Sequence, residues 1–460
     1  MSAEPPILVV GAGPAGMAAA ATLAEAGLRP MVLDKAPSPG GQGWRAPNPA
    51  ASAPLASFDS DGAEPARERF LELARRGRID WYPGTTVIDV TRDRLWALGP
   101  SGEVDSTTWS RLVLCPGAIE RILPLPGWTL PGVYTLGGAQ TALKAQACAV
   151  GRRVAFVGTG PLLWLAAAQH VACGVEVAVV ADTARLGDGL AAAPALLADR
   201  DRLRLGLRCT RILRRAGVPV LRGVRAAAIV GEQRVEAVRI ATNRSERTFA
   251  CDAVATSFGL VPQLQLLDLL DVPIRFEPEG GSWFAETDPD GRTPVRGVHL
   301  AGDAARVRGA AAAALAGELT ALALLEDLGR PVDTARLARL RRERHRHARF
   351  ARALARAFPF PAALEDAIAD DTIVCRCEGI TARVLREAVR AFEVGEVNRA
   401  KALTRCGMGR CQGRFCGPTM ARLVARARGV DLDAVGRLRS QPPVEPLPAR
   451  ARLAEAEPVA

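Results

Sequence analysis

Two glycine-rich turns, each set between an apolar run and an alanine-rich segment, constrain the fold of this 460-residue chain more than any other feature. The first turn, GAGPAG, lies within PILVVGAGPAGMAAAATLAEAGLRPMVLDK, and the second, GTGPLL, within RRVAFVGTGPLLWLAAAQHVACGVEVAVVAD. Each segment has the pattern strand, tight turn, helix, strand, which is the βαβ unit of dinucleotide-binding folds. Because the units lie about 150 residues apart, close to a typical domain length, the sequence predicts an α/β protein with two such Rossmann-like domains.

The glycines of the first turn indicate a dinucleotide site. Gly11 permits the tight turn, Gly13 lets backbone amides approach a pyrophosphate, and Gly16 allows the helix to pack closely on the strand. Asp34 ends the next predicted strand, where a carboxylate can accept hydrogen bonds from an adenosine ribose. The alternative is an empty unit of the same shape, but the acid and the surrounding pattern favour dinucleotide binding.

The second turn leaves two interpretations open. Gly158 and Gly160 are present, but Leu163 stands where a third glycine allows close approach of helix and strand. Asp182 ends the following strand and is able to serve a ribose. This unit either binds NAD(P) or acts only as a scaffold.

The cysteines concentrate in the last quarter of the chain. Four thiolates converging from two loops suit a tetrahedral zinc ion or a [2Fe-2S] cluster, and nearby glycines and arginines suit a redox centre. The alternative is a group of buried free cysteines. Residues 1–330 contain no Cys-x-x-Cys, which argues against a dithiol relay. Five of the ten cysteines form this group: Cys375, Cys377, Cys406, Cys411 and Cys416.

Composition limits the possible partners and the location. The net charge of +11 comes from arginines spread along an alanine-rich chain with few aromatic residues, so we expect no nucleic-acid binding. The first apolar stretch runs into the glycine turn rather than a cleavage site, and no apolar window is long enough to span a bilayer. We therefore expect a cytoplasmic protein that does not insert into a membrane.

Breaks in the pattern divide the chain into segments. Proline- and glycine-rich stretches follow the first unit, a PFP break follows a long basic helix, and the last twenty residues are too rich in proline to fold alone. The predicted parts are 1–148 and 251–330 as the two halves of the first domain, 149–250 as the inserted second domain, 331–370 as a helical linker, 371–430 as a small cysteine-containing helical domain, and 431–460 as an extended tail.

Residues 5–330 resemble the two-dinucleotide-domain flavoproteins related to the disulfide reductases. LAGDAA matches the turn that places an acid on the ribityl chain of the flavin, DK matches the acid–base pair after the second strand, PGGQ follows this pair as it does in the family, and TTV matches the adenine-contacting loop. The segment CPG stands where that family has Ala-Thr-Gly. The resemblance implies FAD at the first turn, bound by Gly11, Gly13, Pro14, Ala15, Gly16, Asp34, Lys35, Gly41, Gln42, Val87, Gly117, Gly302 and Asp303.

The cysteine-containing segment resembles the bacterioferritin-associated-ferredoxin-like (BFD-like) [2Fe-2S] module, which starts with Cys-x-Cys and closes with a cysteine pair before a helix. This implies ligand roles for Cys375, Cys377 and Cys416, but the usual spacing of the pair would fall on Gly413. In one branch of flavoproteins the cysteine of CQGR is the ligand, which favours Cys411 and leaves Cys406 as a neighbour. The choice between these two cysteines stays open at the level of sequence.

That branch contains the electron-transferring subunits of opine oxidases, hydrogen cyanide synthase and heteromeric proline or hydroxyproline dehydrogenases. Its other motifs also occur here, as GGQ-x-WR and as GAIERILPLPGWTLPGV. The resemblance implies that this chain is a flavin and iron–sulfur subunit of a larger enzyme. A separate FAD-containing subunit oxidises the C–N bond of an amine, imino acid or opine, and this chain receives the electrons and passes them to an acceptor. It also implies an FMN at the subunit interface near Glu120 and Arg121.

The chain offers no convincing acid–base constellation, so no catalytic residue is predicted. Two other functions remain as alternatives. One is a self-sufficient NAD(P)H-dependent reductase of an external acceptor, and the other is a metal-stapled module that only docks a partner.

Overall fold

The computed structural model describes residues 5–58, 62–197, 199–278 and 280–453. A five-stranded sheet in the order β20-β7-β1-β2-β3, with every pairing parallel, forms the centre of the first domain. Helix α1 begins with Pro14, where a missing N–H costs nothing, and its small apolar residues share a core with α9 and α3. The elements are β1 (Ile7–Val10), α1 (Pro14–Glu25), β2 (Met31–Asp34), α3 (Ala63–Arg75), β3 (Asp80–Pro83), β7 (Arg111–Leu114), β20 (Val298–Leu300) and α9 (Ala310–Asp327).

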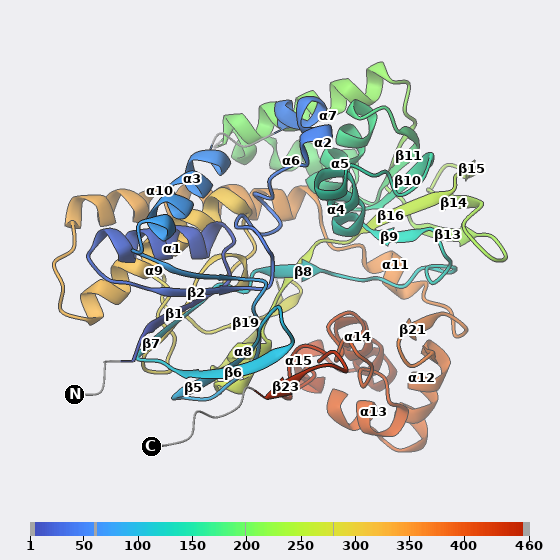
Figure 1. Cartoon of the computed structure of the whole chain (residues 1–460). Coiled ribbons are helices and arrows are strands. Elements are labelled where there is room, and N and C mark those ends of the chain that lie inside the picture. Colours follow the sequence, from blue (N-terminus) through green and yellow to red (C-terminus); the bar gives the residue numbers. More distant parts are fainter. Residues whose placement is uncertain (1–4, 59–61, 198, 279, 454–460) are drawn as a thin grey trace.

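A smaller four-stranded sheet in the order β23-β6-β5-β4 lies beside the first one and shares a core with it (Figure 1). Strands β4, β5 and β6 form an antiparallel meander, and the final strand of the described chain, β23, pairs parallel to β6. Their bounds are β4 (Thr86–Val90), β5 (Arg94–Leu98), β6 (Glu103–Thr108) and β23 (Arg452–Leu453). Close to this sheet lie α8 (Gln265–Leu269) and the hairpin of β18 (Ile274–Glu277) and β19 (Ser282–Ala285).

The second dinucleotide-binding unit is built on a parallel sheet in the order β12-β11-β10-β16-β9. Strands β9 and β16 lie outside residues 149–250, so this sheet also uses the segments that connect the two domains. The antiparallel pair β8 (Ala118–Glu120) and β17 (Leu260–Pro262) joins the domains where the chain enters and leaves. The remaining elements are β9 (Val133–Thr135), α4 (Leu136–Gln146), β10 (Arg153–Gly158), α5 (Pro161–Ala172), β11 (Glu176–Asp182), α6 (Leu186–Leu196), α7 (Arg200–Arg215), β12 (Val220–Arg222), β13 (Ala226–Val230), β14 (Ala237–Ala241), β15 (Glu246–Ala250) and β16 (Ala253–Ser257).

The cysteine-containing segment forms a small, mainly helical domain below the second unit in Figure 1. It shares one hydrophobic core with that unit, in which Leu125 and Ile229 join Val374 and Met420. Its elements are β21 (Ile373–Cys375), β22 (Ile380–Thr381), α12 (Ala382–Ala391), α13 (Val397–Thr404), α14 (Gly417–Arg428) and α15 (Leu432–Val435). The predicted fold class, two dinucleotide-binding domains plus a small helical one, is therefore confirmed.

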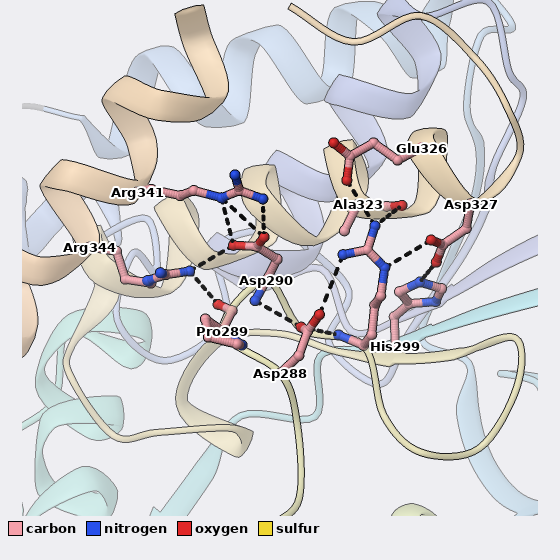
Figure 2. Close-up of polar contacts among 10 residues, drawn as sticks. Asp288, Pro289, Asp290, His299, Ala323, Glu326, Asp327, Arg341 and Arg344 are labelled. Carbon is pink, nitrogen blue, oxygen red and sulfur yellow. Dashed lines mark hydrogen bonds and ion pairs between the residues drawn. The ribbon is translucent and has the colours of Figure 1, made fainter. Parts of the chain in front are cut away.

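The long basic helix α10 (Thr334–Ala357) is fixed to the first domain by ion pairs (Figure 2). Arg341 and Arg344 both reach the buried carboxylate of Asp290, with Arg344 Nη1 2.7 Å from Oδ1. In the same network Arg292, in the loop before β20, donates to Asp327 at 2.8 Å. This hydrogen bond ties that loop to the end of α9. A short helix, α11 (Ala362–Asp366), then leads to the cysteine-containing domain. None of the helices in the described ranges combines the length and the apolar character needed to cross a membrane.

Candidate functional site

The first glycine turn is as tight as the spacing of its residues predicts. Gly11 has a φ of +100°, and a Cβ atom at this position would lie 2.4 Å from the Cys115 carbonyl oxygen. A Cβ at Gly16 would lie 1.7 Å from the carbonyl oxygen of Gly11. Only glycine fits at either position, and the resulting close contact brings the first turn of α1 against the end of β1.

Asp34 lies at the end of β2, beside the turn. Its carboxylate accepts hydrogen bonds from the backbone N–H groups of Ala12 and Ala36. Burial raises the pKa of this carboxyl group, and the two N–H donors offset that effect only in part. The loop before β4 is held against the same strand end, since Thr85 N donates to the Asp34 carbonyl oxygen at 2.8 Å. Lys35 is exposed directly after Asp34, and Val87, two residues after Thr85 in β4, is buried in the core of this domain.

The PGGQ loop covers the first turn. Gly40 N donates to the Ala12 carbonyl oxygen at 2.8 Å, and a Cβ at Gly41 would come within 2.9 Å of the Cα atom of Gly13. The side chain of Gln42 accepts a hydrogen bond from Arg45. Two glycine backbones, those of Gly13 and Gly41, thus face each other with no side chain between them.

The glycine–aspartate turn after β20 approaches the same place from the other side. A Cβ at Gly302 would lie 2.8 Å from the Cβ of Ala15, so this turn touches the start of α1. The Asp303 carboxylate accepts hydrogen bonds from Arg308 N at 2.8 Å and Gly309 N at 3.1 Å, and burial raises its pKa. Gly117, which follows the end of β7, has a φ of +76° and open space where a Cβ would stand.

These residues gather at the carboxyl ends of the strands of the first sheet, where open α/β sheets bind their ligands. Close-packed glycines, the N-terminus of a twelve-residue helix and carboxylates at both ends form a cradle suited to a dinucleotide. The donor and acceptor types present fit the diphosphate, ribose and ribityl groups of FAD.

The second turn differs from the first at its acid. Asp182 is fully buried, and both of its oxygens are used within the chain: Trp164 Nε1 donates to Oδ2 at 2.7 Å and Ala184 N donates to Oδ1 at 2.9 Å. The Arg222 guanidinium lies 4.7 Å from the centre of the Trp164 ring. Burial raises the pKa of Asp182 to about 6. Asp34 also accepts two hydrogen bonds within the chain but is only partly buried, whereas Asp182 is fully buried, so the carboxylate expected to serve a ribose is out of reach of a ligand.

All five cysteines of the C-terminal group converge. The sulfur atoms of Cys375, Cys406 and Cys416 are buried and lie within 4.8 Å of one another, while Cys377 Sγ lies 3.9 Å from Cys411 Sγ. None of these five cysteines forms a disulfide. The structure thus brings together the four predicted ligands and also Cys406, which the sequence favours only as a neighbour.

Two of the five thiols are favoured as thiolates, whereas burial raises the pKa of Cys377 and hydrogen bonds to Cys375 raise the pKa values of Cys406 and Cys416. Hydrogen bonds from Cys406 and Cys416, followed by backbone N–H groups of the two loops, lower the pKa of Cys375 to about 2. Hydrogen bonding to Cys416 and to backbone N–H groups lowers the pKa of Cys411 to about 5. A Cβ at Gly409 would lie 2.1 Å from the Cβ of Cys377, so a glycine is required where the loop passes this cysteine. Converging cysteine sulfurs with amide donors around them suit an iron–sulfur cluster.

The fold and the two sites define an FAD-dependent oxidoreductase with a C-terminal [2Fe-2S] domain. Residues 5–317 match the family described as pyridine nucleotide-disulphide oxidoreductase, and residues 373–426 match the BFD-like [2Fe-2S] binding domain. The chain belongs to this oxidoreductase family. Both family resemblances inferred from the sequence are confirmed, as are FAD and a [2Fe-2S] cluster as the cofactors.

Individual proteins of known name are similar to this chain over almost its whole length. The chain is 38% identical to an opine oxidase subunit of Agrobacterium tumefaciens over 98% of its length and 90% of that protein. It is 32% identical to the hydrogen cyanide synthase subunit HcnB of Pseudomonas aeruginosa, covering 96% of this chain and 97% of that one. The crystal structure of L-proline dehydrogenase from P. horikoshii has the same fold, with a TM-score of 0.68 over 97% of this chain and 78% of the other at 18% identity.

Proposed function

We propose that this chain is the flavin and iron–sulfur electron-transfer subunit of a heteromeric dehydrogenase or oxidase that oxidises the C–N bond of an amine, imino acid or opine. The observation that carries the proposal is the presence of two separate cofactor sites in one chain, the glycine cradle of the first domain and the five converging sulfurs. Relatives named as subunits of opine oxidase and hydrogen cyanide synthase support the heteromeric state and the C–N substrate class.

The residues of the cradle have distinct proposed tasks. The first turn and the N-terminus of α1 bind the diphosphate through backbone N–H groups, Asp34 accepts from the adenosine ribose, and Asp303 accepts from the ribityl chain. Lys35 and Val87 border the adenosine, and the loop that contains Gly41 and Gln42 covers the diphosphate. A flavin exchanges electrons in pairs or singly while a [2Fe-2S] cluster takes one at a time, so the pair together suits onward transfer to a one-electron acceptor.

We propose Cys375, Cys377, Cys411 and Cys416 as the four cluster ligands. Cys377 and Cys411 lie 3.9 Å apart, and Cys375, Cys406 and Cys416 lie within 4.8 Å of one another, so the preference for Cys411 over Cys406 takes its support from the CQGR motif and not from these distances. Cys411→Ala is expected to lose most of the bound iron and sulfide, whereas Cys406→Ala retains both. Iron and sulfide analysis of the two variants checks this, and retention in Cys411→Ala together with loss in Cys406→Ala would reverse the assignment.

The partner is proposed to be an FAD-containing subunit that removes hydride from the substrate, with an FMN between the two subunits. Arg121 is buried, donates to the Gly280 carbonyl oxygen at 3.0 Å and lies over the Phe360 ring, and Glu120 accepts from Gly137 N at 2.9 Å. These contacts hold both side chains inside the chain. The proposed FMN site near this segment therefore takes its support from sequence resemblance and not from these side chains.

The contacts of Asp182 weigh against the self-sufficient NAD(P)H-dependent reductase. A nicotinamide dinucleotide at the second turn needs an acceptor for its ribose, and the Asp182 carboxylate is fully buried against Trp164 and Ala184. Electrons then enter from the partner subunit and not from NAD(P)H.

A visible absorption spectrum of the anaerobically purified chain, with analysis for iron, sulfide and zinc, tests the proposal. We expect flavin bands over broad red-shifted absorption, iron equal to sulfide, and no bleaching by NADH or NADPH. Rapid bleaching by either nucleotide would favour the self-sufficient reductase. Flavin bands with bound zinc and without iron would favour a metal-stapled docking module.

A further inference from the structure

The tail after the iron–sulfur domain returns to the first domain. In Figure 1 its red end lies beside the blue-to-cyan strands β5 and β6, far in sequence from where it started. β23 pairs parallel to β6, with Arg452 opposite Glu103, and these two residues also form an ion pair. Between α15 and β23 the chain passes both proposed cofactor sites. The segment that contacts them consists of Pro443, Val444 and Glu445, and we call it the strap.

One side of the strap contacts the segments proposed to border the adenosine. Val444 N donates to the Ile88 carbonyl oxygen at 2.7 Å, and the Val444 side chain, 3% exposed, is packed in the same core as Val87. Lys35 Nζ lies 3.1 Å from Glu445 Oε2. The strap therefore touches both β4 and the residue directly after Asp34.

The other side of the strap contacts the loop that bears two proposed cluster ligands. Gln412 donates through Nε2 to the Pro443 carbonyl oxygen, and Arg414 donates through Nη2 to the Val444 carbonyl oxygen. Arg414 Nη2 also lies 3.3 Å from Glu445 Oε1, and the Arg414 side chain is only 10% exposed. Both donors lie between Cys411 and Cys416 in sequence, so the strap holds the backbone that positions these sulfurs.

We propose that the strap couples FAD binding to cluster binding, with Glu445 as a positioning residue between Lys35 and Arg414. This inference rests on the proposed function, because it assumes that FAD and the cluster occupy the assigned sites. When the cluster orders the loop, Gln412 and Arg414 hold the strap against β4 and Lys35, which favours FAD. By thermodynamic necessity FAD then favours retention of the cluster by the same factor.

A strap that only adds stability makes a different prediction. It would lower the unfolding free energy of the whole chain when altered, but the affinity for FAD would be the same with and without the cluster. A coupling element changes the FAD affinity only while the cluster is present. The ratio of two FAD affinities is therefore the readout that separates the two roles.

The experiment measures the dissociation constant of FAD by flavin fluorescence on the full chain, with the cluster assembled and after its removal by a chelator. In the unaltered chain we expect FAD to bind roughly fivefold or more tightly with the cluster present, the lower end of typical coupling between sites. In Glu445→Ala and Glu445→Gln the two dissociation constants should converge. Glu103→Ala is the matched control, because it removes an ion pair of the tail that touches neither cofactor segment.

Each outcome decides the matter. Coupling in the unaltered chain and in Glu103→Ala, but not in the two Glu445 variants, supports the strap. Equal dissociation constants in the unaltered chain, or coupling that survives both Glu445 variants, overturns it. A chain that binds no FAD or assembles no cluster would instead overturn the proposed function, so the two failures are distinguishable.

Discussion

Replacing Trp164 by phenylalanine should destabilise the protein much more than the same change at Trp109. The two side chains are matched, since each residue is 7% exposed. Trp164 Nε1 donates to the buried Asp182 carboxylate at 2.7 Å, whereas Trp109 Nε1 has no acceptor among the residues that the structure describes. The substitution therefore removes a similar amount of buried ring at both positions but removes a hydrogen bond only at Trp164.

The size of the difference follows from the acceptor. A hydrogen bond to a charged group contributes about 1.5–3 kcal/mol to stability. Removing a donor that has no acceptor within the described ranges, as at Trp109, loses no such contribution. Trp164→Phe is therefore expected to lower the free energy of unfolding by about 1.5–3 kcal/mol more than Trp109→Phe at pH 8. Urea unfolding followed by circular dichroism, on both variants and the unaltered chain, measures this difference.

The difference should also depend on pH. The pKa of Asp182 is raised to about 6, above its unfolded value, so its protonation stabilises the fold at low pH and that stabilisation is lost as the pH rises through about 6. Trp164 supports the charged form, hence its removal costs most above pH 6 and least near pH 5. Equal destabilisation by the two variants at pH 8, or a difference that does not shrink at pH 5, would refute this account of the second turn.

Three further predictions address the cradle and the contacts that hold the domains together. Gly16→Ala places a Cβ 1.7 Å from a carbonyl oxygen and should abolish FAD retention in flavin analysis, whereas Gly187→Ala, with open space around it, should retain FAD. Burial raises the pKa of Asp268, but hydrogen bonds from its arginine partner and a backbone N–H lower it overall, so its stabilising effect is present at neutral pH and lost in acid. Asp268→Asn should accordingly release the segment after α15 to limited proteolysis at pH 7, and cleavage no faster than in the unaltered chain would contradict this. Asp290→Asn leaves two arginines of α10 without their shared carboxylate. It should lower the free energy of unfolding, measured in urea, by on the order of 3 kcal/mol, and a negligible change would show that these ion pairs do not stabilise the fold.

The local features of this protein follow from its sequence alone. Gly11 and Gly16 predict the first turn because a positive φ and a close contact between backbones each exclude a side chain, and both constraints act within a few residues. The strands and helices around the turns follow from apolar runs and alanine-rich stretches for the same reason. The density of cysteines in the last quarter likewise predicts a metal centre before any contact is known.

Other features of the protein arise from contacts between residues far apart in the chain. No local pattern predicts that the indole of Trp164 will fill the acceptor of Asp182, because a strand end and a helix face must first be packed together. The pairing of Glu445 with Lys35 and Arg414 likewise requires the last domain to dock on the first two. Sequence periodicity predicts which face of each helix or strand is buried. It does not predict which residues from distant parts of the chain meet at that face. The function of the first turn could therefore be predicted from its glycines. The interpretation of the second turn and of the strap required the packed structure.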